Sequence, residues 1–247
     1  MHSYLRIGIT TLAVPLAGLA AWLYHLRRTL SQTTTSSHSR RLPSTETQQQ
    51  QQSSYPISLP PDVAAADSPW IIAHERVLSD PVPRTVLPQE DLLLAYTRAA
   101  HVAFGRTPNA FAVRSMLQRS EPARQSFDES WIRASHFAVG DRINGAYTVS
   151  YHGEGRVPGS ERVELALDPP ASYSGPRPRG VIIAEVLPAP GSSDHVVFVN
   201  ESWMWRRDDE KPTLVETSVG GWLHDLMARW LVVQGIAELK GQKEKHA

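Results

Sequence analysis

The sequence predicts an α+β domain in which an antiparallel sheet carries two short helices and one long C-terminal helix. Three patterns over residues 67–241 support this fold class. Helical periodicity occurs twice after a first apolar segment, a period of two then dominates residues 131–217, and helical periodicity returns at 219–239. The length suits a single core. An N-terminal transmembrane helix and a linker are expected to precede the domain.

Residues 1–28 are predicted to be a transmembrane anchor. No charged side chain lies between Ile7 and Tyr24. As a helix, Ile7–Leu26 would span the roughly 30 Å hydrocarbon core, because each residue adds about 1.5 Å. The excess of arginine after this segment favours a single-pass membrane protein with its C-terminal domain in the cytosol. The lipid bilayer is therefore the first expected partner.

Two alternatives stay open for this segment. A cleaved signal peptide would use Arg6 and the apolar run Ile7–Ala17, with Gly18 and Ala20 before the cut. The chain has no acidic residue before Glu46 and is rich in Arg, Ser and Thr there, which also suits a mitochondrial address. An inner-membrane anchor would then place the domain in the matrix. The lack of cysteine excludes a disulfide framework and leaves the compartment open.

Residues 29–66 are predicted to form a disordered linker, and residues 242–247 a tail. The linker segment contains the run Gln48–Gln52, four prolines and many Ser and Thr residues, too little apolar surface to offset the entropy of ordering it. From Asp62 onward the chain has 20 basic and 24 acidic residues. This slightly acidic domain has no electrostatic footprint for nucleic acid. The sequence does not set the oligomeric state.

The first half of the domain is expected to contain a strand and two helices. Trp70–Leu78 is apolar and β-branched enough for the strand. Pro88 is expected to open a helix with Glu90 and Asp91 in its first turn, and Gly105 to end it. Thr107-Pro108 then starts a shorter helix, with Thr as N-cap. Its expected buried face comprises Phe111, Val113, Met116 and Leu117.

Strands are expected to dominate the second half. The Asn144-Gly145 pair predicts a type I′ turn, because both residues accept positive φ angles. A long helix is predicted over Val219–Leu239. The six expected strands are Trp131–Val139, Ala146–His152, Arg162–Leu167, Val181–Leu187, His195–Arg206 and Thr213–Thr217.

This order of elements resembles the helix-grip fold of the START, polyketide-cyclase and plant-allergen superfamily. The resemblance implies that a curved sheet wraps the last helix and that the gap between them holds an apolar ligand. Phe137–Tyr147 (FAVGDRINGAY) and Asn200–Leu239 are also similar to uncharacterised membrane-anchored proteins of filamentous fungi. That second resemblance implies no activity.

Two carboxylates interrupt apolar strands and are candidates for a site. By alternation Glu201 shares a face with Val199 and Trp203, where an unpaired carboxylate would be costly. It is either a cavity carboxylate that binds or protonates a ligand, or half of an ion pair with an arginine such as Arg206 or Arg162. Glu185 poses the same choice. The candidate ligand-binding residues are Glu201, Glu185, Trp203, Tyr147 and Trp222.

Other patterns predict neither a metal site nor a cofactor. His224 and Asp225 are adjacent on the last helix and do not face each other, so His224 is interpreted as a surface or capping residue. No HExxH motif and no nucleophile elbow is present. The leading hypothesis is a membrane-tethered domain that binds a small apolar or lipid-like molecule. The alternatives are a cyclase-like or acyl-processing enzyme using Glu201, Glu185 or Asp141, and a scaffold without a ligand.

Overall fold

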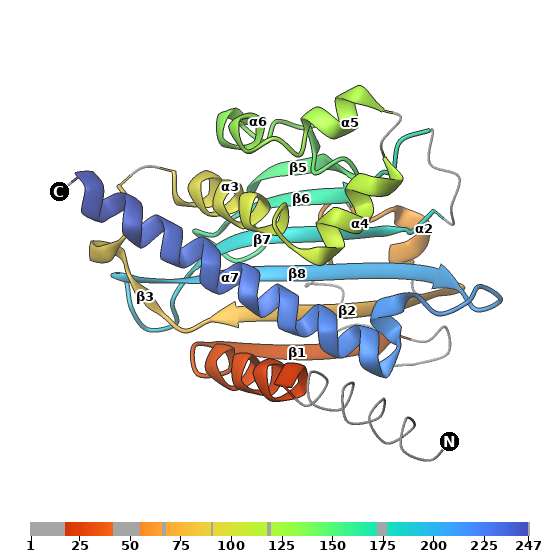
Figure 1. The fold of residues 1–247 in the computed structure, drawn as a ribbon, viewed down its shortest axis with the longest axis horizontal. Coiled ribbons are helices and arrows are strands. Elements are labelled where there is room, and N and C mark those ends of the chain that lie inside the picture. The colour runs from red at the N-terminus through yellow and green to blue at the C-terminus, as the bar shows by residue number, and fades with distance from the viewer. Residues whose placement is uncertain are drawn as a thin grey trace, which may run out of the picture.

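The computed structural model describes residues 18–41, 55–65, 68–89, 91–117, 120–171 and 177–246. These residues form an α+β fold with one antiparallel sheet and a long C-terminal helix that crosses it (Figure 1). The strands are β1 (Thr34–Arg41), β2 (Trp70–Ser79), β3 (Val82–Pro83), β4 (Arg142–Ile143), β5 (Tyr147–Glu154), β6 (Glu161–Leu167), β7 (Gly180–Pro188) and β8 (His195–Arg207). The helices are α2 (Pro61–Ala64), α3 (Leu92–Phe104), α4 (Pro108–Met116), α5 (Glu121–Gln125), α6 (Glu129–Ala134) and α7 (Ser218–His246), with 3-10 turns η2 (Arg84–Val86) and η3 (Leu214–Glu216).

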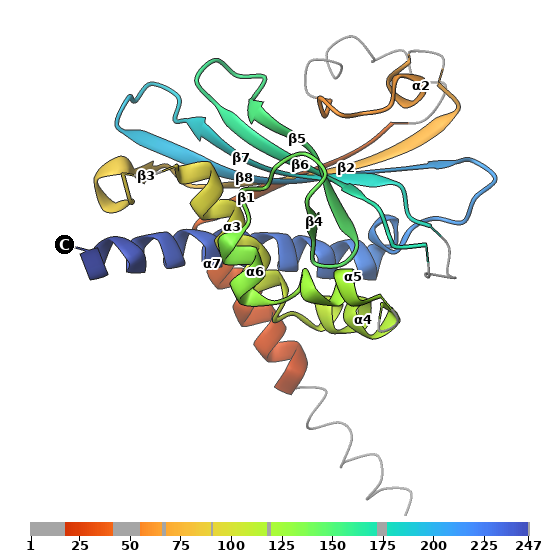
Figure 2. The same cartoon turned by 90° about the horizontal axis from the view of Figure 1, so that it is seen from above.

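The sheet has the strand order β1-β2-β8-β7-β6-β5-β4, and β3 pairs with β8 off this path. Helices α3 to α7 lie on one face, and α2 lies on the other (Figure 2). Strand β8 is central, with Ile72 of β2 opposite Trp205 and Ile183 of β7 opposite Glu201. Its predicted alternation is confirmed, because Phe198 packs in the core under the helices while Trp203 packs on the opposite face. Both faces of the sheet are therefore covered.

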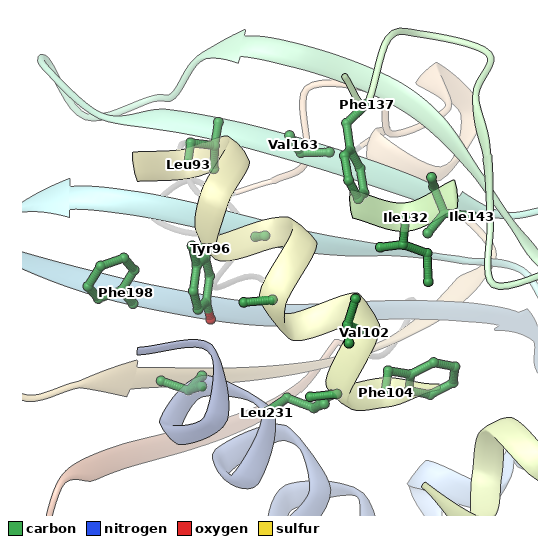
Figure 3. Packing of buried hydrophobic residues seen from close by; sticks show 14 of the residues in the cluster. Leu93, Tyr96, Val102, Phe104, Ile132, Phe137, Ile143, Val163, Phe198 and Leu231 are labelled. Atoms are coloured by element: carbon green, nitrogen blue, oxygen red, sulfur yellow. The ribbon is translucent and has the colours of Figure 1, made fainter. Parts of the chain in front are cut away.

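Helix α3 forms the centre of the core. The helix ends at Gly105, as predicted, but it starts after Pro88, because Asp91 is its N-cap and accepts a hydrogen bond from the Leu94 amide at 2.9 Å. Its buried side chains lie between the sheet and α7, with Tyr96 4.9 Å from Phe198, ring centroid to ring centroid (Figure 3). Gly235 of α7 lets the two helices approach, because a Cβ there would lie 2.7 Å from the Tyr96 ring. Helices α3 and α7 therefore form one layer, which packs on one face of the sheet.

The predicted turn between β4 and β5 is confirmed. Asn144 and Gly145 have φ angles of 45° and 72°. Gly145 is required for a second reason, since a Cβ there would lie 2.5 Å from Leu117 and 2.7 Å from Phe127. The turn is thus packed into the helical layer.

Two predicted strands and one predicted helix face are wrong. Residues 129–134 form α6, which buries Ile132. In its first turn Glu129 pairs with Arg133 at 2.8 Å. Residues 214–216 form η3, because the Glu216 carboxylate accepts hydrogen bonds from the amide and hydroxyl of Thr213. On α4 the side chains of Phe111 and Met116 are exposed, and the buried residues are Ala110 and, just after the helix, Leu117.

The predicted transmembrane anchor is overturned. Residues 7–17 lie outside the described part of the chain, and the described residues 18–30 are helical. This helix ends in a turn at 31–33 that leads into β1, and its Leu30 is buried. Among the described residues, no helix has the length and apolar character needed to cross a membrane. This finding overturns the prediction of a single-pass membrane protein, with its orientation and its mitochondrial inner-membrane alternative.

Part of the expected linker belongs to the domain. All eight residues of β1 pair with β2, and this polar segment forms the edge strand of the sheet. Arg229 of α7 fixes its start by donating hydrogen bonds to the Thr34 carbonyl and hydroxyl at 2.7 and 3.0 Å. Residues 55–65 cover the face of the sheet that carries Trp203. The run Gln48–Gln52 lies outside the described residues.

Candidate functional site

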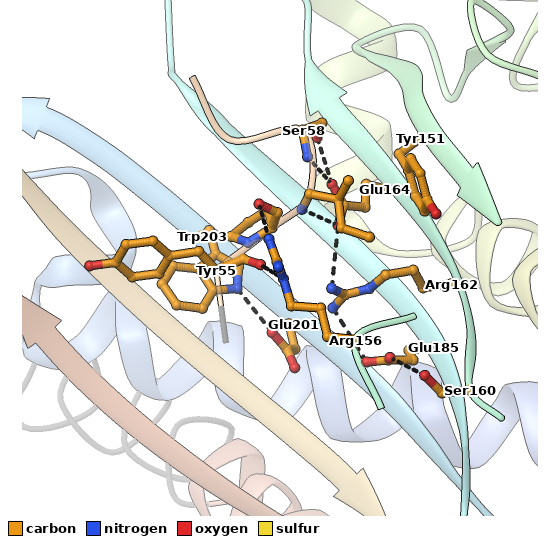
Figure 4. Close-up of polar contacts among 12 residues, drawn as sticks. Tyr55, Ser58, Tyr151, Arg156, Ser160, Arg162, Glu164, Glu185, Glu201 and Trp203 are labelled. Carbon is orange, nitrogen blue, oxygen red and sulfur yellow. Dashed lines mark hydrogen bonds and ion pairs between the residues drawn. The ribbon is translucent and has the colours of Figure 1, made fainter. Parts of the chain in front are cut away.

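The structure divides the five predicted site residues among three places. Glu201, Glu185 and Trp203 lie on the sheet face that residues 55–65 cover, called here the outer face (Figure 4). Tyr147 lies on the opposite face, under the helices. Trp222 lies on α7 beside the helix of residues 18–30, with the Arg27 guanidinium 5.9 Å from its ring. They therefore do not form one site.

Glu201 is neutralised by its neighbours. Its carboxylate lies 2.9 Å from Arg76 Nε and 3.3 Å from His74 Nε2, and it accepts a hydrogen bond from Trp203 Nε1 at 2.9 Å. Burial by itself would raise the pKa of Glu201, but these partners hold it below its ordinary value. The Trp203 ring stacks on His74 at 3.7 Å. Glu201 is thus an ion-pair partner.

Glu185 belongs to a second buried network on the same face. It accepts a hydrogen bond from Ser160 at 3.0 Å and lies 3.3 Å from Arg162, which is also 3.4 Å from Glu164 (Figure 4). The backbone amides of Ile57 and Ser58 donate to Glu164 at 2.7 Å each. Burial raises the pKa of Glu185. The interpretation of Glu185 and Glu201 as arginine ion pairs fits this geometry.

Tyr147 lines a cavity between α3, α7 and the inner face of the sheet. The cavity has a volume of about 60 Å³. Burial raises the pKa of Tyr147 to about 12, which keeps its hydroxyl protonated. Six of the eleven lining residues are apolar, and the others contribute polar groups. The lining residues are Ala100, His101, Phe104, Tyr147, Ile182, Asn200, Ser202, His224, Met227, Ala228 and Leu231.

A polar groove of about 250 Å³ lies beside this cavity, and Ser202 lines both. Strands β1, β2 and β8 and the turn η3 contribute its walls. Glu75 of β2 lies directly opposite Ser202 in the sheet and accepts a hydrogen bond from His224 Nδ1 at 3.0 Å. The lining residues are His38, Ser39, Arg40, Ala73, His74, Glu75, Ser202, Val215 and Glu216. The Glu75–His224 pair therefore joins the groove to the cavity.

The sequence interpretation missed this pair. His224 was expected at the surface or as a cap, and its partner comes from a strand 149 positions earlier. One signal was available. In β2, Ala73, Glu75 and Val77 alternate onto the inner face, so Glu75 interrupts an apolar pattern as Glu201 does. No group of three His, Asp or Glu side chains within the described ranges is arranged to hold a metal ion.

Burial of His101 in the cavity wall makes the free energy of unfolding depend on pH. The ring is buried, its Nδ1 lies 2.7 Å from Asn144 Oδ1, and burial lowers its pKa from 6.5 to about 4. The unfolded chain binds this proton more readily, so stability from this group is complete above pH 6.5 and is lost as the pH falls toward 4. The loss is expected to reach about 3 kcal/mol.

The measurement is urea denaturation of the wild type and of His101→Gln at pH values from 4 to 8. The decline of the variant over this range should be smaller than that of the wild type by about this amount. His136→Gln removes an exposed histidine and is the matched control, with the wild-type profile expected. Equal profiles for His101→Gln and the wild type would contradict the assignment.

No protein-family model matches the chain, and neither a curated protein nor a solved structure shows significant similarity to it. The resemblances to the helix-grip superfamily and to the fungal proteins therefore stay predictions.

Proposed function

We propose that this domain binds a small, largely apolar molecule with one hydrogen-bonding end, in the cavity between α3, α7 and the sheet. The observation that carries the proposal is the composition of the wall. Phe104, Ile182 and Leu231 offer apolar contact, while Ser202 and His224 are among the few polar residues of the lining. An enclosed apolar pocket with a few convergent polar groups is the usual form of a small-molecule site.

The size of the cavity limits the ligand. A volume of about 60 Å³ corresponds to roughly two water molecules, at about 30 Å³ each. A lipid-like molecule would need more room. Met227 of the wall is only partly buried and its unbranched side chain can repack, so we expect entry to displace it.

Binding is favoured over catalysis because the predicted catalytic carboxylates are occupied. Glu201 and Glu185 pair with arginines on the outer face, away from the cavity. Asp141 holds a turn, where it accepts hydrogen bonds from the Ala138 amide and the Ser135 hydroxyl. None of the three lines the cavity or the groove.

Phenol, which joins an apolar ring to one hydroxyl, is the probe for this proposal. In methyl NMR spectra, phenol is expected to cause saturable shifts of Ile182, Met227 and Leu231. The methyl groups of Val181 and Ile183 should not shift, because these residues lie on the outer face. Cyclohexanol and decanoate, tested in parallel, report how large a ligand the cavity accepts.

Two variants fill the cavity from different helices. Ala228→Met on α7 and Ala100→Leu on α3 should each weaken phenol binding at least tenfold, since both alanines are buried in its wall. Ala237→Met places the same side chain at an exposed position of α7 and should bind phenol like the wild type. Absence of saturable shifts with all three probes would overturn the proposal in favour of a scaffold without a ligand. So would unchanged binding by both filled variants.

A further inference from the structure

One carboxylate oxygen of Glu75 has no hydrogen-bond donor among the described residues. Its side chain is 7% exposed, and its Oε2 atom lies 3.0 Å from His224 Nδ1 and 3.7 Å from His38 Nδ1. Its Oε1 atom is buried and has no hydrogen-bond partner among the described residues. A buried carboxylate oxygen without a donor is costly, so this atom marks a position where a donor would be stabilised.

The other buried carboxylates of the described chain have a partner that Glu75 lacks. Each lies within 3.4 Å of an arginine guanidinium, which balances its charge as well as donating to it. Within the described residues, both ion-pair partners of Glu75 are histidines. The four arginine-paired carboxylates are Glu164, Glu185, Glu201 and Asp225.

The groove provides space beside Glu75 for a cation from outside the chain. Glu75 forms part of its wall, and its volume of about 250 Å³ is close to the lower end of small-molecule sites. The second carboxylate of the wall, Glu216, lies 2.9 Å from Arg206 and 3.5 Å from Arg40. Asp225, which approaches His38 from α7, is paired with Arg229 at 3.0 Å. Glu75 is therefore the groove carboxylate without a guanidinium.

We propose that the groove between β1, β2 and η3 binds the primary ammonium group of a small organic molecule, and that the Glu75 carboxylate turns toward the groove so that Oε1 accepts a hydrogen bond from the ammonium. An ammonium has three donors and a compact charge, so it satisfies this oxygen and replaces the missing arginine. An anion would meet an acceptor that it cannot satisfy. A neutral hydroxyl would satisfy the oxygen without balancing the charge. This site stands on the groove's own geometry and does not depend on ligand binding in the cavity.

The test is titration with n-butylamine, n-butanol and butyrate, three probes of one chain length that differ in charge. The histidine ring resonances of the full chain are followed by NMR at pH 7.5. Butylammonium is expected to cause saturable shifts of His38 and His224, which butanol and butyrate do not reproduce. Equal saturation by butanol would overturn the proposal.

Two variants examine the contact. Glu75→Gln, which keeps the shape, should weaken butylammonium binding at least tenfold, whereas Glu161→Gln at an exposed strand position should leave it unchanged. Ala73→Leu narrows the groove and leaves Glu75 in place, so it tests binding in the groove even if Glu75→Gln does not fold. It should also lose binding, and wild-type binding by Ala73→Leu would overturn the proposal.

The histidines offer a competing source of positive charge. If ¹⁵N shifts of the free protein show His38 or His224 as an imidazolium at pH 7.5, Glu75 already has its counter-charge and the proposal fails. Neutral rings support it. If butylammonium does not bind, the phenol test still stands, because it is measured at Ile182, Met227 and Leu231.

Discussion

Replacing Arg162 with methionine is expected to lower the free energy of unfolding by about 3–5 kcal/mol, the usual cost of removing one partner from a buried ion pair. Arg162 is 2% exposed and lies between Glu164 and Glu185. Glu164 keeps its hydrogen bonds from the Ile57 and Ser58 amides, but Glu185 keeps only that from Ser160. The variant therefore leaves two buried carboxylates without a counter-charge, and Glu185 also has few remaining hydrogen bonds.

Chemical denaturation of the wild type and of Arg162→Met measures this loss. Arg114→Met is the matched control, since both members of the Arg114–Asp128 pair are exposed, and it should change stability by about 0.5 kcal/mol or less. Adding Glu185→Gln to Arg162→Met removes one of the two uncompensated charges and should recover part of the loss. If Arg162→Met were as stable as the control, the buried network would not be needed to hold residues 55–65 and the sheet together.

Replacing Phe198 with alanine is expected to cost about 3–5 kcal/mol, because the substitution leaves a cavity in a packed core. Phe198 is fully buried on the inner face of β8 and packs against Tyr96 of α3. Its ring therefore links the central strand to the central helix. The measurement is again the free energy of unfolding, and retention of near-native stability would show that the α3 layer is not packed on the sheet as described.

Phe111→Ala provides the control for the same chemical change. The Phe111 side chain is 76% exposed on α4, so its removal should alter stability by about 0.5 kcal/mol or less. The sequence pattern placed Phe111 in the buried face of its helix. A large loss in this variant would support that earlier interpretation.

Local chemistry in the sequence predicted most elements of the fold. Alternation predicted β5 to β8 within two residues, and the Asn144-Gly145 pair predicted its turn because few other residues accept positive φ angles. The signals at Thr107 and Gly105 placed helix ends, since capping depends on neighbouring residues alone. At one place, however, alternation misled although signals for a helix start were present. The pattern at 131–139 predicted a strand, while Asp128 and Glu129 at its start favour the helix that forms.

The sequence by itself determined the α+β class, the long last helix and the two-sided burial of β8, because hydrophobic period reports which faces of an element are covered. It could not decide which partner covers each face. Only the tertiary structure placed Arg76 beside Glu201, Arg162 between two carboxylates, and His224 of α7 against Glu75 of β2. These contacts join residues far apart in the chain, and long-range pairing leaves no local trace in composition or spacing. The same reason explains the polar segment 34–41, which becomes a strand because the edge of β2 offers it a partner.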